Sequence, residues 1–145
     1  MNSPVCIDAS LVLRTLVPDA FTEQALALLA RWQEKQTTLI APALLAFEVT
    51  ATLRRYVHFK RIAPAQGESA FAQWQALGIR LSHRKALFPL AWALAKQFQR
   101  PTAYDTAYLA LAQLHHCDFW TADEKLYNAV KDKLTWVKWV GNPDL

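Results

Sequence analysis

The stretch PVCIDASLVL, residues 4–13, decides how the fold is read. Residues 4–7 form a short apolar run that is typical of a buried strand, and Asp8 follows this run directly. A short helix is predicted next, capped by Ser10 and ending near Val17. In an open α/β sheet, ligands bind beyond the carboxyl ends of the strands. Asp8 is therefore predicted to stand in the crevice of such a sheet.

The rest of the chain alternates between strand and helix patterns. Further strands are predicted at 37–42, 78–82, 118–120 and 135–140, and helices at 21–35, 43–59, 64–77, 84–99, 102–116 and 122–130. Strands separated by helices indicate a mostly parallel sheet covered on both faces. Because no internal repeat, low-complexity segment or linker interrupts the pattern, a single α/β domain over residues 1–145 is expected.

The composition narrows the class of protein. Of the 145 residues, 53% are hydrophobic and 19% are charged, which indicates a substantial core and argues against disorder. The three glycines exclude a glycine-rich phosphate loop. Cys6 and Cys117 lack the spacing of a zinc site or a redox pair, and a reduced, cytoplasmic compartment is expected. No signal peptide or membrane-spanning stretch is recognised.

The basic residues are clustered. The net charge is +4 and the pI is near 9.2, with basic clusters at 54–61, 80–85 and 131–138. A basic surface around an acidic pocket suits a polyanionic substrate that is approached through a metal ion. Solvated helix faces would account for the same charge equally well.

Carboxylates stand in apolar surroundings at Asp8, Glu48, Asp105 and Asp123. Burying an unpaired carboxylate costs free energy, so acids in apolar surroundings are usually exposed, neutralised or bound to a ligand. Hard oxygen donors gathered at the carboxyl ends of strands would form a site for Mg²⁺ or Mn²⁺.

Three of these acids also have a structural interpretation. Asp8 can cap the helix that follows the first strand. Asp105 lies three residues after Thr102, as in a capping box, although its helical neighbours are apolar. Asp123 lies between Thr121 and the next acid, which already fit a capping box. For Asp8 and Asp105 the capping and ligand interpretations both stay open. For Asp123 taken alone, an acid favoured by the helix dipole is the better interpretation, but its position after the strand at 118–120 also makes it face the crevice of Asp8.

Glu48 has no such structural role, because it lies in the middle of a predicted helix. Arg55 shares its face of that helix but is seven residues away, so a salt bridge would need a long reach. A metal-ligand or catalytic role is therefore favoured for Glu48. Arg54 and Arg55 are candidates for contacts with phosphates, and Ser10 for a hydrogen bond to a ligand or to a metal-bound water.

Three segments, taken in order, resemble the PIN domain and especially the VapC-type ribonuclease toxins of bacterial toxin–antitoxin pairs. They are IDASLVL (7–13), PALLAFEVTATLRR (42–55) and AYDTAYLALAQLHHCDFWTADEKL (103–126). The resemblance implies an acidic quartet of Asp8, Glu48, Asp105 and Asp123, accompanied by the hydroxyl of Thr121. It also implies a five-stranded parallel sheet, a homodimer, RNA as the substrate and an antitoxin protein as the partner. Residues 60–100 carry no family signature, and substrate choice is expected to lie there.

By this resemblance the chain is expected to be a Mg²⁺- or Mn²⁺-dependent endoribonuclease that leaves a 5′-phosphate and a 3′-hydroxyl. Asp8, Asp105 and Asp123 are expected chiefly to bind the metal, while Glu48 orients or deprotonates the attacking water or ligates a second ion. Two alternatives stay open. One is a PIN nuclease of RNA processing without an antitoxin, and the other is a non-catalytic RNA-binding or scaffold module.

Overall fold

The computed structural model describes residues 3–142, which contain five strands and seven helices. In chain order these are β1 (Val5–Ile7), α1 (Ala9–Leu16), α2 (Thr22–Glu34), β2 (Leu39–Pro42), α3 (Leu44–His58), α4 (Pro64–Ala76), β3 (Arg80–Ser82), α5 (Leu87–Gln97), α6 (Tyr104–Leu114), β4 (Asp118–Thr121), α7 (Glu124–Val130) and β5 (Val137–Trp139). The predicted order of strands and helices is confirmed. None of these helices is long and apolar enough to cross a membrane.

The strands form one parallel sheet in the order β3-β2-β1-β4-β5. β1 lies at its centre, where Val5 pairs with Leu39 of β2 on one side and with Asp118 of β4 on the other. The chain builds outward from β1 to β3 and then returns to add β4 and β5 on the opposite side. Strand order therefore reverses between β1 and β4, and such a reversal opens a crevice at the carboxyl ends of the two strands. The predicted α/β class with a five-stranded parallel sheet is confirmed.

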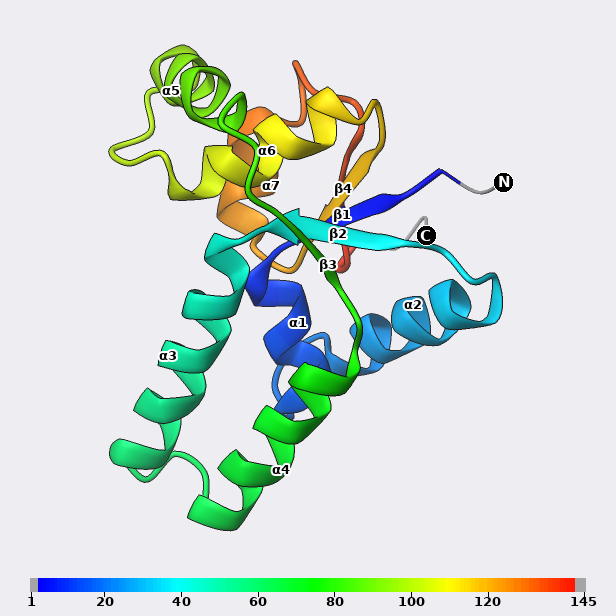
Figure 1. Ribbon diagram of the computed structural model, residues 1–145, viewed down its shortest axis with the longest axis vertical. Helices are drawn as coiled ribbons and strands as arrows, with labels where there is room; N and C mark the ends of the chain where they lie inside the picture. The colour runs from blue at the N-terminus through cyan, green and yellow to red at the C-terminus, as the bar shows by residue number, and fades with distance from the viewer. Residues whose placement is uncertain (1–2, 143–145) are drawn as a thin grey trace.

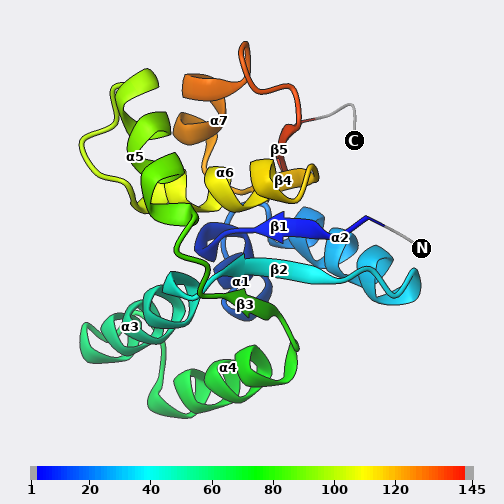
Figure 2. The same cartoon turned by 45° about the horizontal axis from the view of Figure 1, so that its top comes forward.

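Helices cover both faces of this sheet (Figures 1 and 2). Helices α5, α6 and α7 lie on one face, and α1 to α4 lie on the other. Figure 1 shows α3 and α4 side by side, projecting away from the sheet. The two helices meet closely at Gly67, where a Cβ atom would lie 2.4 Å from Cγ2 of Val57.

The most deeply buried helix is α6. Its residues Leu109, Ala110, Leu111 and Ala112 are all 0% exposed, because the helix packs on β1, β2 and β4 and is covered by α5. A helix that is apolar on every side is one that is enclosed by its neighbours. The enclosure fixes the position of the first turn of α6, which carries Asp105.

Of the two caps predicted for α1, Asp8 is confirmed and Ser10 is wrong. Asp8, rather than Ser10, is the N-cap, and its side chain accepts a hydrogen bond from the backbone N–H of Leu11 at 3.1 Å. The backbone of Asp8 is extended (φ −108°, ψ 175°), as an N-cap requires, whereas Ser10 already lies inside the helix.

Two further predicted caps were wrong. The residue before α6 is Ala103, which makes no capping hydrogen bond, so Thr102 does not cap this helix. The N-cap of α7 is Asp123, whose side chain accepts from the backbone N–H of Leu126 at 3.2 Å. Thr121 does not cap α7 because it is still the last residue of β4, and its hydroxyl donates to Asp8, the residue after β1.

Five helices, α2, α3, α5, α6 and α7, start one to three residues later than predicted. The helix expected at 21–35 begins at Thr22, because Phe21 adopts a left-handed backbone conformation (φ 67°) that a right-handed helix excludes. The helix expected at 84–99 begins at Leu87, after the turn at 85–86.

Candidate active site

Asp8 lies directly after β1, at the point where strand order reverses. Its carboxylate is held by three donors: the Ser10 hydroxyl and the Leu11 N–H donate to Oδ1 at 2.7 and 3.1 Å, and the Thr121 hydroxyl donates to Oδ2 at 2.6 Å. The residue is only 7% exposed. Because Thr121 ends β4, this hydrogen bond joins the carboxyl ends of the two central strands.

The same two hydroxyls also fix the segment that follows β4. The backbone N–H of Ala122 donates to Oγ of Ser10 at 2.9 Å, and the N–H of Asp123 donates to Oγ1 of Thr121 at 3.0 Å. The hydroxyl oxygens of Ser10 and Thr121 are 3.2 Å apart. These hydrogen bonds link Asp8, Ser10 and Thr121 to the backbone of residues 122–123, and they therefore hold Asp123 beside Asp8. Ser10 and Thr121 both contact Asp8 directly, while a hydrogen bond from Ser10 to a ligand or to a metal-bound water stays a prediction.

The pKa of Asp8 is raised to about 6 from the ordinary 3.8. Burial is the main cause, and the negative charge of Asp123 adds to it, while the hydrogen bonds from Thr121, Ser10 and Leu11 act in the opposite direction. The ionised form is thus disfavoured as long as no cation stands beside it. A bound cation would reverse this balance.

Glu48 projects from α3 and is half-buried. Its Oε1 atom accepts a hydrogen bond of 2.5 Å from the hydroxyl of Tyr108 on α6. Burial raises the pKa of Glu48, the Tyr108 hydrogen bond lowers it, and the nearby charge of Asp105 raises it further. The pKa of Tyr108 is raised, first by burial and then by Glu48, so the phenol remains a proton donor. Arg55 makes no ion pair with Glu48.

Asp105 lies in the first turn of α6 and pairs with a residue that was not predicted for the site. Nη2 of Arg100 donates to Oδ2 of Asp105 at 3.2 Å, with the two side chains 24% and 43% exposed. The Nε atom of Arg100 is buried and has no hydrogen-bond partner among residues 3–142. No spacing rule singles out Arg100, because it precedes the helix that carries its partner.

The acids stand in two neighbouring pairs. The charge of Asp123 acts on Asp8, and the charge of Asp105 acts on Glu48. Within residues 3–142, no three Asp, Glu, His or Cys side chains come close enough to form a metal cage. Mg²⁺ is usually held by one or two carboxylates, several waters and the phosphates of a substrate, so carboxylate pairs fit this ion by their chemistry.

Arg54 and Arg55 are exposed on α3. Arg54 lines a shallow depression between α3 and α4 together with Glu68, and none of the acids described above lines this depression. Their contact with RNA stays a prediction.

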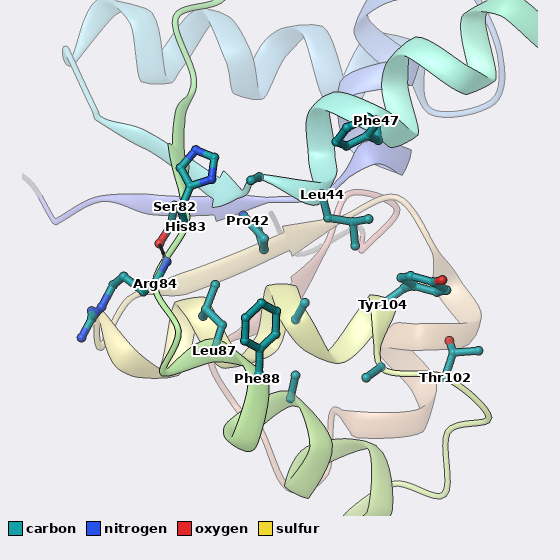
Figure 3. A pocket seen from close by; sticks show the side chains of 14 residues that line it. Pro42, Leu44, Phe47, Ser82, His83, Arg84, Leu87, Phe88, Thr102 and Tyr104 are labelled. Atoms are coloured by element: carbon teal, nitrogen blue, oxygen red, sulfur yellow. Dashed lines mark hydrogen bonds between the residues drawn. The ribbon is translucent and has the colours of Figure 1, made fainter.

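An apolar groove of about 650 Å³ lies between α3, α5 and α6, and none of the four acids lines it (Figure 3). It is lined by the start of α3, the segment between β3 and α5, and the starts of α5 and α6. Large exposed side chains on its walls include Phe47 (79%), Phe88 (74%) and Tyr104 (61%), and Trp92 on α5 is 67% exposed. Phe47 and Tyr104 immediately precede Glu48 and Asp105 in the chain. Apolar surface of this kind usually marks an interaction site.

Comparison with known proteins agrees with this architecture. Residues 5–132 match the PIN domain family. The chain is 30% identical over 122 residues to the VapC ribonuclease Mb0985 of Mycobacterium bovis, and equally to ribonuclease VapC9 of two strains of Mycobacterium tuberculosis. Each match covers 84% of this chain and 87% of the relative. The parallel sheet, with Asp8 at the point where strand order reverses, agrees with these matches. The chain therefore belongs to the PIN-domain family and, within it, to the VapC-type members.

Proposed function

We propose that this protein is a metal-dependent endoribonuclease that hydrolyses phosphodiester bonds of RNA and serves as the toxin of a toxin–antitoxin pair in the cytoplasm. The observation that carries the proposal is Asp8, a buried carboxylate with a raised pKa, held beside Asp123 where the strand order of a PIN-family sheet reverses. The naming of its relatives as ribonucleases supports RNA as the substrate.

The proposed role of each residue follows from its surroundings. Asp8, Asp123 and Asp105 are the proposed ligands of Mg²⁺ or Mn²⁺, which when bound would neutralise phosphate charge and lower the pKa of a water molecule. Ser10 and Thr121 keep Asp8 in place through the hydrogen bonds described above. Glu48, with its raised pKa, suits the role of accepting a proton from the attacking water or of binding a second ion.

The test of this function is cleavage of RNA by purified protein with Mg²⁺ or Mn²⁺, and again with excess EDTA. Activity should require the metal and should be absent from an Asp8→Asn variant purified in the same way, which controls for contaminating nucleases. Undiminished cleavage in EDTA would rule out the metal mechanism. Cleavage by the Asn variant at the wild-type rate would contradict the proposed role of Asp8 in the reaction.

The proposed homodimer is formed through the apolar groove, with a second copy of the chain covering Phe47, Phe88, Trp92 and Tyr104. Exposed aromatic residues of this kind are enriched in protein interfaces. Light scattering at micromolar concentration should give twice the chain mass of 16.5 kDa. A Trp92→Glu substitution should shift the protein to the monomer, and a monomeric wild type would contradict this arrangement.

The proposed antitoxin is a small protein that carries a basic side chain into the acids. The pairing of Arg100 with Asp105 supports this, because one of the acids already accepts a guanidinium group. Co-expression of the neighbouring gene product should relieve toxicity in cells. If toxicity persists, RNA processing without an antitoxin becomes the better description.

A further inference from the structure

Tyr108 is a buried aromatic residue that contacts both central strands of the sheet. It is 3% exposed and stands on α6, three residues after Asp105. Its ring packs against that of Phe119 on β4, with centroids 6.2 Å apart, and its carbonyl accepts a hydrogen bond from the thiol of Cys6 on β1 at 3.5 Å. The residue is therefore anchored to β4 through its ring and to β1 through its backbone carbonyl.

The hydroxyl of Tyr108 reaches from this anchored ring to Glu48, 60 residues earlier in the chain. Within residues 3–142 this is the one hydrogen bond that the Glu48 side chain makes. Glu48 is half-buried, and its side chain has three rotatable bonds. Without the contact to Tyr108, no other polar group in this part of the chain would hold the carboxylate in one orientation.

A buried phenol needs a hydrogen-bond acceptor, and any backbone carbonyl would meet that need. The acceptor is instead one of the four acids, on a helix from the opposite face of the sheet. Residues that hydrogen-bond to catalytic or metal-binding groups fix the orientation of those groups. The hydrogen bond occupies Oε1, and among the described residues 3–142 no group bonds to Oε2 of Glu48.

We propose that Tyr108 is a positioning residue of the nuclease centre: its hydroxyl holds Oε1 of Glu48, so that Oε2 alone acts on the attacking water or on a bound metal ion. This inference rests on the proposed nuclease function. Unlike the four acids, Tyr108 would touch neither the substrate nor the metal.

The first test is a Tyr108→Phe variant, which keeps the packed ring and removes only the hydroxyl. Its kcat on RNA should fall by about tenfold or more. If Oε2 binds an ion, Mn²⁺ binding measured by calorimetry should weaken by a similar factor, and if Oε2 acts on the water, Mn²⁺ affinity should stay the same. KM should stay within about twofold, because a residue so deeply buried cannot contact RNA. Tyr127→Phe is the matched control, since Tyr127 is half-buried and its hydroxyl makes no hydrogen bond to the described residues. The control should match the wild type.

A double-mutant cycle separates positioning from a general effect on the fold. In a Glu48→Ala background, Tyr108→Phe should leave Mn²⁺ affinity unchanged, because the group through which Tyr108 acts is gone. Equal losses of affinity in both backgrounds would mean that the hydroxyl only stabilises the fold, which overturns the inference. So would an unchanged kcat in the Tyr108→Phe variant.

A second variant keeps the test open if Tyr108→Phe does not fold. Glu48→Asp retains the charge but withdraws the carboxylate by about 1.5 Å, the length of one carbon–carbon bond, from the Tyr108 hydroxyl. Its kcat should fall, and wild-type activity would show that position is immaterial and overturn the inference. A wild-type protein that neither binds Mn²⁺ nor cuts RNA would remove the proposed function together with this inference. An active wild type with an unaffected Tyr108→Phe variant overturns this inference alone.

Discussion

Replacing Asp8 by Asn should stabilise the protein in the absence of metal. Asn resembles the protonated carboxyl group in size and shape, and the surrounding hydrogen bonds can adapt to it. Its oxygen can still accept from Ser10 and Leu11, while its amide can donate to Thr121, whose hydroxyl can turn toward the oxygen of Ser10 at 3.2 Å. The substitution therefore removes a buried charge and keeps a partner for each of the three existing hydrogen bonds.

The magnitude follows from the pKa of Asp8. The folded value of about 6 lies above the ordinary 3.8, and the difference corresponds to about 3 kcal/mol, at about 1.4 kcal/mol per pKa unit. Because the folded pKa is the higher one, this stability is fully present below pH 3.8 and is lost as the pH rises through 6. At pH 8 the wild type lacks it, whereas the Asn variant should regain about 1–3 kcal/mol, or about 3–9 °C in Tm.

The assay is thermal unfolding in EDTA at pH 8 and pH 5. The gain of the Asn variant should shrink to about half at pH 5, where much of the wild-type Asp8 is protonated in the folded state. Asp132→Asn, at an exposed position, is the control and should change Tm little at either pH. Adding Mg²⁺ should raise the Tm of the wild type but not that of the Asn variant. A Tm several degrees lower than wild type at pH 8 would mean that Asp8 is mainly a structural cap.

Three further substitutions test other parts of the structure. Thr121→Val removes the hydroxyl that serves both Asp8 and Asp123, so it should cost about 1–3 kcal/mol in urea unfolding and reduce activity; a neutral result would contradict the hydrogen-bond geometry. Arg100→Met removes a partly exposed ion pair, so stability should change by less than about 1 kcal/mol, while calorimetry should detect tighter Mn²⁺ binding because a competing cation is gone. Weaker binding would show that Arg100 assists the metal instead. Leu109→Ala, in the enclosed helix α6, should cost about 2–5 kcal/mol in the same urea titration, and a loss below about 1 kcal/mol would mean that the helix is loosely packed.

Much of the fold could be predicted from local patterns. Short apolar runs such as 4–7 and 37–42 belong to strands buried on both faces, and the helices between these strands indicate a parallel sheet. The four acids could be selected because each stands where a carboxylate is costly, and Asp8 and Asp123 because they follow strands. The caps were harder to predict, since a hydroxyl and a carboxylate two residues apart compete for the same N–H groups, and only the backbone geometry decides between them.

The contacts of the side chains with one another could not be predicted. The apolar neighbours of Asp105 predicted a buried face of α6, and Tyr108 on that face is buried. That its hydroxyl ends on Glu48 depends on the tertiary fold, which brings residues 60 positions apart together and which no periodicity encodes. The pairing of Arg100 with Asp105 likewise depends on how the chain turns before α6. Long-range pairs of this kind follow from tertiary packing and leave no regular spacing behind.

The hydrogen bond between Asp8 and Thr121 joins residues that are 113 positions apart. During synthesis from the N-terminus, the first carboxylate therefore leaves the ribosome long before the hydroxyl that holds it. Strand β4 must then insert beside β1, and pairing of this non-local kind is slow compared with helix formation. A partly synthesised chain that ends before β4 contains Asp8, Glu48 and Asp105 but lacks Thr121 and Asp123, so its candidate active site is incomplete. For a protein proposed to destroy RNA, this order of assembly delays activity until most of the chain has been made.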